Sequence, residues 1–230
     1  MYIAIKLVSG VERGVEIRYS LDGEVRYVTI ASRAEAKLVK DVDGYERSAE
    51  VVMQGVLRPP KSGTYVFLVE AGDGESRLVI ESRELSLRSD GGILVSTPIH
   101  LLDTGFYRYR LEHVSRAPIT KVRMFWLRED GVVEPIGRDN SYVQRGTSIV
   151  VQGLRDGCRA MLTSIGIVSE APVRNGVAEL SLGDLKPPID VCLELVCGSV
   201  REKVVCLSGV WGGDVYRIDT VESLRRHGLR

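Results

Sequence analysis

The 230-residue sequence lacks any long apolar run, and its charges cancel. No stretch of about 18 apolar residues occurs, so no segment is a candidate membrane-spanning helix. The 31 acidic and 31 basic residues are interspersed and leave no broad field of one sign to attract nucleic-acid phosphates. The first residues, MYIAIKL, become charged too soon for a signal peptide. The composition therefore predicts no membrane span and no nucleic-acid partner, and it leaves the cellular compartment open.

Amide side chains are also scarce. Asparagine occurs only at positions 140 and 175, glutamine occurs only at positions 54, 144 and 152, and arginine far outnumbers lysine. A low content of deamidation-prone amides is typical of thermophile proteins, so we predict a hyperthermophilic, archaeal source. Because such organisms keep disulfides even inside cells, the cysteines do not report the compartment.

Motifs for catalysis and for zinc binding are missing. The three histidines, His100, His113 and His227, have no spacing that suggests a zinc site, and we expect each of them at the surface or at an interface. No Gly-x-Ser-x-Gly elbow, phosphate-binding loop or dinucleotide fingerprint occurs. With 44% hydrophobic and 27% charged residues, the chain still has the composition of a folded protein. We therefore predict a protein that binds or assembles and is not an enzyme.

Alternation of apolar and polar residues predicts an all-β protein. Residues 15–19 and 25–30 alternate clearly and are joined by a turn at Asp22 and Gly23, which is typical of a hairpin. Residues 31–50 stay open, since 34–38 would also suit a helical turn. Further strands are expected at residues 3–7, 49–53, 63–69, 77–80, 93–97, 107–113, 122–127, 148–152, 159–164, 177–182, 191–197, 204–207 and 215–218.

The length and the strand pattern favour two domains. A polar, turn-rich stretch at residues 129–140 separates two sets of strands. We predict two β-sandwich domains, at residues 1–130 and 131–230, the second ending in a short C-terminal tail. The second domain has short strands and Asn-Gly or Asp-Gly turns, and it is similar in style to immunoglobulin-like modules.

Several segments of the first domain resemble the protective-antigen (PA-fourteen) domain family. The matching segments, in the family's order, are GTYVF at 63–67, GDGES at 72–76, LVIE at 78–81, LLDTGFYRYRLE at 101–112 and VRMFW at 122–126. The resemblance covers residues from about 14 to 127 and implies a β-sandwich of a kind found in toxins, adhesins, glycosidases and cell-surface proteins. The alternative is that the aromatic residues only fill a core, as they would in any sandwich.

The resemblance also implies carbohydrate binding at particular loops. In the calcium-dependent members two consecutive aspartates hold the ion, and here the second is Asp73 while Gly72 replaces the first. The implied ligand-binding residues are Asp73, Glu75, Ser115 and Arg116, with Asp73 as the calcium ligand. Calcium takes six to eight oxygen ligands, and the missing carboxylate and the charge of Arg116 both oppose it. We therefore predict no cofactor, with calcium as the alternative, and Asp73-Gly74 would otherwise form a simple hairpin turn.

All four cysteines lie in the second domain, at Cys158, Cys192, Cys197 and Cys206. Residues 191–197 and the strand that follows resemble the two arms of a hairpin, which would bring Cys192 near Cys206. Cys158 or Cys197 would then find another partner. The alternative is that all four are small buried apolar side chains without a disulfide.

Two kinds of function are compatible with these patterns. The first is a structural or interaction protein in a larger surface or particle assembly, with protein partners or self-assembly through open edge strands and with glycan recognition. The second is a lectin-like or adhesin-like carbohydrate-binding module, calcium-assisted or not, or an accessory domain of a glycosidase. The resemblance favours a cell-surface or particle location.

Overall fold

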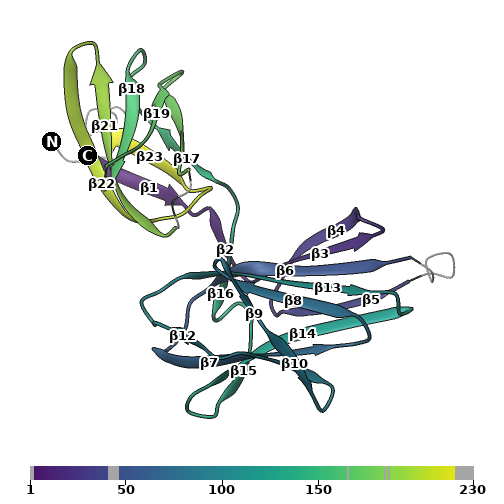
Figure 1. Ribbon diagram of the computed structural model, residues 1–230. Coiled ribbons are helices and arrows are strands. Elements are labelled where there is room, and N and C mark those ends of the chain that lie inside the picture. The colour runs from purple at the N-terminus through teal and green to yellow at the C-terminus, as the bar shows by residue number, and fades with distance from the viewer. Residues whose placement is uncertain (1–2, 41–46, 165, 184, 186, 221–230) are drawn as a thin grey trace, which may run out of the picture. The chain divides into compact units, whose positions relative to one another are not determined.

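The computed structural model describes residues 3–40, 47–164, 166–183, 185 and 187–220 (Figure 1). All regular secondary structure among these residues is β-strand, as the alternation of apolar and polar residues predicts. They include no helix long and apolar enough to cross a membrane. The chain divides into a central unit, Arg13–Val143, and a terminal unit made of the described residues of Met1–Glu12 and Gln144–Arg230.

The bounds of these units differ from the predicted domains, 1–130 and 131–230. Strand β1 (Ile3–Val8) pairs antiparallel with β23 (Val215–Thr220), so the first strand belongs to the same sheet as the last. Residues 131–143 instead join the central unit, because β15 (Val133–Pro135) pairs with β14 (Ile119–Arg128). Both pairings are invisible to a local hydrophobic pattern, which shows that a strand exists but not which strand it pairs with.

Two mainly antiparallel sheets form the central unit. The eight-stranded sheet has the order β2 (Val11–Arg13), β16 (Ser141–Gln144), β6 (Ala49–Leu57), β13 (Tyr107–Ser115), β8 (Glu75–Ile80) and β9 (Arg83–Leu85), with β3 (Val15–Leu21) paired to β6 and β4 (Glu24–Ala31) paired to β3. The seven-stranded sheet has the order β10 (Leu87–Asp90), β11 (Ile93–Ser96), β7 (Gly63–Ala71), β14 and β15, with β12 (Ile99–Leu101) paired to β7 and β5 (Glu35–Val39) paired to β14.

The core of the central unit draws on both sheets and contains the aromatic residues of the Gly-x-Tyr-x-Phe segment. Tyr65 and Phe67 point inward from β7, with ring centroids 4.9 and 6.4 Å from that of Trp126 on β14. All three side chains are buried, together with Leu111 of the opposite sheet. Tilted aromatic pairs at such distances add about 0.5–1.5 kcal/mol each beyond the area they bury. The alternation of strand residues thus places these aromatic residues in the core.

Strand β5 lies in the segment that the sequence left open. Ala36 is buried between exposed neighbours, which is the alternation of a strand and not the face of a helix. The strand pairs antiparallel with β14, from Val39 opposite Ile119 to Glu35 opposite Arg123. A helical turn at 34–38 therefore does not form.

The terminal unit contains two four-stranded sheets. One has the order β1, β23, β17 (Ser148–Gln152) and β20 (Val177–Ser181), and the other has the order β19 (Gly166–Pro172), β18 (Arg159–Ser164), β21 (Ile189–Cys197) and β22 (Val200–Val210). Neighbouring strands are antiparallel except for β17 and β23, which pair parallel. Buried side chains from both sheets, such as Ile149 and Leu162, share one core, so this unit is also a sandwich.

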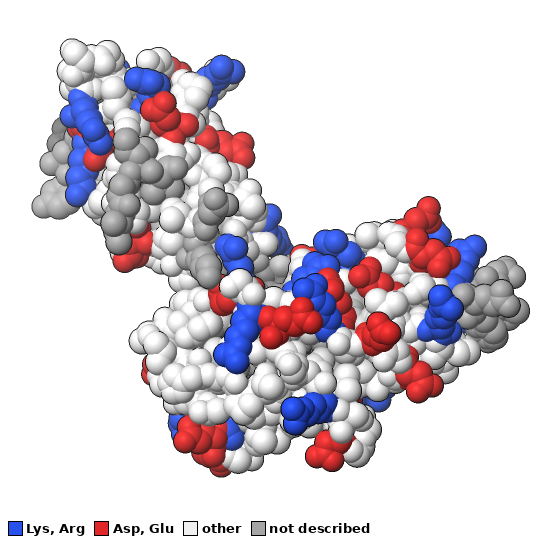
Figure 2. Space-filling model, viewed as in Figure 1, with Lys and Arg blue, Asp and Glu red and all other residues white. Residues whose placement is uncertain are grey.

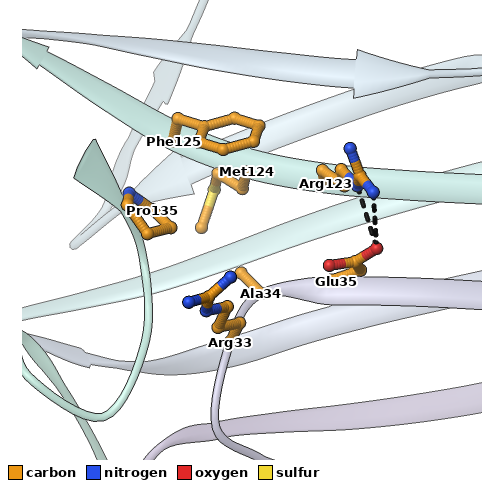
Figure 3. Close-up of a pocket in the computed structure, with 7 residues that line it drawn as sticks. All are labelled: Arg33, Ala34, Glu35, Arg123, Met124, Phe125 and Pro135. Atoms are coloured by element: carbon orange, nitrogen blue, oxygen red, sulfur yellow. Dashed lines mark hydrogen bonds and ion pairs between the residues drawn. The ribbon is translucent and has the colours of Figure 1, made fainter. Parts of the chain in front are cut away.

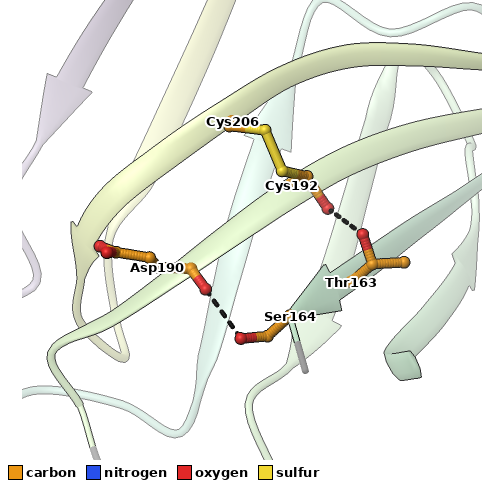
Figure 4. Close-up of a disulfide and its surroundings, with 5 residues drawn as sticks. All are labelled: Thr163, Ser164, Asp190, Cys192 and Cys206. Carbon is orange, nitrogen blue, oxygen red and sulfur yellow. Dashed lines mark hydrogen bonds between the residues drawn. A yellow bond between two sulfur atoms is a disulfide. The ribbon is translucent and has the colours of Figure 1, made fainter. Parts of the chain in front are cut away.

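Two disulfides hold β21 in the terminal unit. Cys192 is bonded to Cys206, which lies directly opposite on β22 (Figure 4); this is the pair that the predicted hairpin brings together. Cys158 is bonded to Cys197, for which the sequence named no partner. Cys158 is buried in the core whereas Cys206 is exposed. One cross-link therefore lies inside the sandwich and the other lies on its outer face.

A buried carboxylate fixes the turn before β23. Asp214 accepts hydrogen bonds from the backbone N–H groups of Gly10, at 2.6 Å, and Trp211, at 2.9 Å, and from the hydroxyl of Tyr216, at 3.0 Å. Burial and the charge of Asp214 raise the pKa of Tyr216 above its ordinary value. Three donors compensate the lost hydration of one buried carboxylate.

Charged residues of both signs are mixed over the surface. Figure 2 shows lysine and arginine interspersed with aspartate and glutamate on the face of each unit that it displays, without a broad patch of one sign. Many of them pair, for example Arg77 with Glu84 at 2.8 Å and Arg123 with Glu35 at 2.8 Å. Exposed pairs of this kind contribute only about 0–1 kcal/mol each. The mixed surface agrees with the charge pattern of the sequence.

Candidate binding site at the Asp73 loop

The four predicted ligand-binding residues come together in the central unit. Asp73, Glu75, Ser115 and Arg116 all line one open depression of about 520 Å³. Its walls are the connection between β7 and β8 and the connection between β13 and β14. Ser48, just before β6, also lines the depression and was missed, because the sequence left residues 31–50 without an assignment.

The Asp73 loop carries the chain from one sheet to the other. Strand β7 belongs to the seven-stranded sheet and β8 to the eight-stranded sheet, so Asp73 and Gly74 do not form the hairpin turn that was the alternative expectation. Gly74 has φ +144°, and a Cβ atom there would lie 2.2 Å from the carbonyl oxygen of Val114. Only glycine allows the loop to pass this close to β13.

His113 lies directly beneath this loop. The prediction of a surface or interface position is wrong for His113, because the alternation of β13 turns it inward and leaves it fully buried. Its Nδ1 lies 2.9 Å from the hydroxyl of Ser76, and its Nε2 has no hydrogen-bond partner among the described residues. Burial lowers the pKa of His113, so the imidazole is neutral at pH 7. His100 is exposed as expected, and His227 lies outside the described residues.

Ser115 shapes the second wall, and its hydroxyl takes part in the structure of the turn that follows. The hydroxyl oxygen accepts the backbone N–H of Ala117 at 3.1 Å, and the residue is buried. Its carbonyl oxygen accepts the ammonium of Lys40 at 3.3 Å, and Lys40 also donates to the carbonyl of Arg47 at 2.6 Å. Burial lowers the pKa of Lys40. These bonds hold the end of β13 in place beside Arg116.

Three charged side chains around the depression are available to a ligand. Asp73, Glu75 and Arg116 are exposed, and none of their side chains forms a hydrogen bond or an ion pair with another described residue. Two carboxylates and one guanidinium supply strong acceptors and strong donors within one open surface. This arrangement can hydrogen-bond a polyhydroxylated or zwitterionic ligand.

The same residues do not fit a calcium ion. Calcium takes six to eight oxygen ligands, commonly with several carboxylates. Gly72 offers no side-chain oxygen next to Asp73, and no three His, Cys, Asp or Glu side chains in the described part of the chain come together to hold a metal. The guanidinium of Arg116 adds a positive charge to the same depression.

Comparison with known proteins finds similarity in structure only. No family model matches the chain, and no curated protein matches its sequence. A PA14 sugar-binding domain from an RTX adhesin is 14% identical, with a TM-score of 0.46, and the alignment covers 57% of this chain and 98% of that domain. An anti-sigma factor domain-containing protein is 17% identical, with a TM-score of 0.50, over 80% of this chain and 67% of that one. The A domain of epithelial adhesin 9 from Candida glabrata, in complex with Galb1-3GlcNAc, is 10% identical, with a TM-score of 0.46. The alignment covers 59% of this chain and 91% of that one.

The similar structures therefore include PA14 domains, PA14 being the short form of PA-fourteen, as the sequence resemblance predicts. At such low identity the similarity concerns the fold and not the ligand.

Proposed function

We propose that this chain is a non-catalytic binding protein whose central unit recognises the hydroxyl groups of a glycan at the Asp73 depression, without calcium. The observation that carries the proposal is the convergence of Asp73, Glu75 and Arg116, all exposed and unpaired, on one depression from two connections. The sequence resemblance, which implies carbohydrate binding at these same loops, supports it further.

Sugar hydroxyls match this set of side chains chemically. Each hydroxyl both donates and accepts, so neighbouring hydroxyls can donate to the carboxylates of Asp73 or Glu75 and accept from the guanidinium of Arg116. Hydrogen bonds to ionised groups are roughly twice as strong as neutral ones. A ligand on an open depression remains partly solvated, so we expect a modest affinity per site.

The loops that carry these side chains are held in place before any ligand arrives. Gly74 packs tightly against β13, the N–H of Gly72 donates to the carbonyl of Lys121 at 3.2 Å, and Ser115 is anchored by Ala117 and Lys40. Loops that are already ordered lose little conformational entropy on binding. This order favours recognition by a preformed surface.

A glycan array probed with the purified chain in EDTA tests the proposal. We expect wild-type protein to bind a defined subset of glycans, and Asp73→Asn and Arg116→Gln to lose roughly tenfold or more in affinity for them. Asp90→Asn is a matched control, because Asp90 is an exposed aspartate of the same unit that does not line the depression. Failure of the wild type to bind any glycan, or an equal loss in Asp90→Asn, would contradict the proposal.

Assembly is a second candidate function, favoured by strand β4. This strand pairs only with β3 within the described residues, so its other edge presents backbone groups that no strand satisfies. Its side chains Val25, Tyr27 and Val28 are 53%, 60% and 48% exposed. An exposed apolar edge strand is a template for pairing with another chain.

Light scattering after size-exclusion chromatography tests this second function. If β4 pairs between chains, the wild type forms an oligomer whose mass falls to that of a monomer in Val28→Lys, because a charged edge opposes pairing. If the wild type stays monomeric at high concentration without any added partner, the hypothesis of self-assembly through β4 is wrong.

A further inference from the structure

A second pocket lies where β14 changes its pairing partner, away from the Asp73 depression (Figure 3). Strand β14 pairs with β5 up to Arg123 and with β15 from Phe125 onward, which leaves an opening beside Met124. The opening encloses about 410 Å³. Its lining residues are Arg33, Ala34, Glu35, Arg123, Met124, Phe125 and Pro135. We call it the Arg33 pocket.

The backbone around the Arg33 pocket is complete without a ligand. The N–H of Met124 donates to the carbonyl of Ala34 at 3.0 Å, and the carbonyl of Met124 accepts the N–H of Ile136 at 3.2 Å. The N–H of Ala34 in turn donates to the carbonyl of Ile136 at 2.7 Å. These three hydrogen bonds hold the backbone of Ala34, Met124 and Ile136 without a ligand, so the pocket is preformed.

The walls of the pocket combine apolar and charged groups. Phe125 and Pro135 offer two rings, and the buried Met124 and Ala34 lie beneath them as part of the core. Facing them is an ion pair between Arg123 and Glu35, at 2.8 Å (Figure 3). Glu70 lies 3.5 Å from the same guanidinium, so Arg123 is held by two carboxylates.

Arg33 is the cation of the pocket whose side chain is not ion-paired. It lies just before β5, and its guanidinium forms no hydrogen bond or ion pair with any other described residue. Figure 3 shows its side chain among the lining residues, on the other side of Ala34 from the ion pair. Glu35 and Glu70 already pair with Arg123, so the guanidinium of Arg33 is the group of the pocket that can take an anion.

We propose that the Arg33 pocket binds one carboxylate-bearing sugar ring, that is, a hexuronic acid or a related acidic sugar. The guanidinium of Arg33 takes the ligand carboxylate as a bidentate pair. The apolar face of the pyranose ring packs against Phe125 and Pro135, and its hydroxyls donate to Glu35 and accept from Arg123. This site is separate from the Asp73 depression and does not depend on it.

The ion pair is the reason to choose an acidic sugar over a simple apolar acid. A ligand that covered Glu35 and Arg123 without hydrogen-bonding them would desolvate two charged groups at a net cost. Sugar hydroxyls replace the lost water with donors and acceptors. Ligand pockets run from about 300 to 1,000 Å³, so this small one suits a single ring and not a long chain.

Titration calorimetry with methyl β-glucuronide, and with methyl β-glucoside as the neutral match, tests the proposal. We expect the full chain to bind the glucuronide roughly tenfold or more tightly than the glucoside. Arg33→Gln is expected to reduce glucuronide binding to the level of the glucoside. Lys121→Gln removes the same charge from an exposed position of β14 that does not line the pocket, and is expected to change nothing.

Several outcomes would overturn the proposal. Equal binding of the two glycosides, no binding of either, or an equal loss in Lys121→Gln would each do so. If N-acetylglutamate binds as tightly as the glucuronide, the pocket is a general carboxylate site or an acidic-peptide site and not a sugar site. Asp73→Asn is expected to leave glucuronide binding intact, so failure at one of the two sites is distinguishable from failure at the other.

Discussion

The central unit packs its two sheets together with large aromatic side chains, whereas the terminal unit has two disulfides within one of its sheets and a buried carboxylate. Trp126, Tyr65 and Phe67 are among the largest fully buried side chains of the chain, and all three belong to the central unit. That unit has no cysteine, while all four cysteines of the sequence are bonded within the terminal unit. The smaller core of the terminal unit is thus accompanied by covalent cross-links, which the larger core of the central unit does not have.

The largest expected effect is on the aromatic core. Trp126→Ala leaves a cavity beside Tyr65 and Phe67 and is expected to lower the free energy of unfolding of the central unit by about 3–5 kcal/mol. Scanning calorimetry of the full chain measures this as a shift of one transition. Reducing agent identifies the other transition, because only the terminal unit contains disulfides.

A single transition that moves with both treatments would contradict the idea that the two units are stabilised by separate means. Val133→Ala is the control for Trp126→Ala, because Val133 is 52% exposed on the same pair of strands. Val133→Ala is expected to change the free energy of unfolding of the central unit by no more than about 0.5 kcal/mol.

The next effect in size is the loss of a disulfide. Cys158 and Cys197 close a loop with a sequence separation of 39, and Cys192 and Cys206 one of 14. Chain entropy then predicts a loss of roughly 4 kcal/mol for replacing both Cys158 and Cys197 with alanine, and roughly 3 kcal/mol for the other pair. Denaturant unfolding of the two double variants compares them. A larger loss from the outer pair would show that chain entropy does not order their contributions.

The smallest effect concerns pH and His113. Because burial lowers the pKa of His113 in the folded chain below its ordinary value of 6.5, the unfolded chain binds a proton first as the pH falls. The stabilising contribution of the neutral imidazole is therefore present above about pH 6.5 and is lost as the pH falls toward the lowered pKa of the folded state. Between pH 7 and pH 5, the melting temperature is expected to fall less steeply for His113→Gln than for the wild type.

His100→Gln is the matched control, because His100 is exposed in the same unit. It is expected to keep the pH dependence of the wild type. An identical slope for His113→Gln and the wild type would show that His113 does not contribute to the acid sensitivity of the central unit.

Local alternation predicted most of the strands, but it missed others, such as β5, β15 and β19, and it did not show how the strands pair. The aromatic segment around Tyr65 and the hairpin at Cys192 and Cys206 follow from residues that are near one another in sequence. The union of β1 with β23, and the switch of β14 from β5 to β15, depend on contacts between distant segments. These contacts set the bounds of the units and create the Arg33 pocket, so neither was predictable.

The candidate site shows the same limit. The sequence resemblance selected four residues, Asp73, Glu75, Ser115 and Arg116, and all four line the Asp73 depression, but it missed Ser48. Their local roles depend on three-dimensional packing: Ser115 anchors its loop, Gly74 allows a crossing between sheets, and His113 is buried beneath it. The hyperthermophilic source inferred from composition stays a prediction.

The most direct test of the central claim is a calorimetric titration of a glycan selected on the array, once in millimolar calcium and once in EDTA. We expect the same affinity in both buffers, and a loss of roughly tenfold or more in Arg116→Gln in both, because the free guanidinium and carboxylates bind the hydroxyls directly. Binding that disappears in EDTA, or that is unchanged in both Asp73→Asn and Arg116→Gln, would contradict calcium-independent recognition at the Asp73 depression.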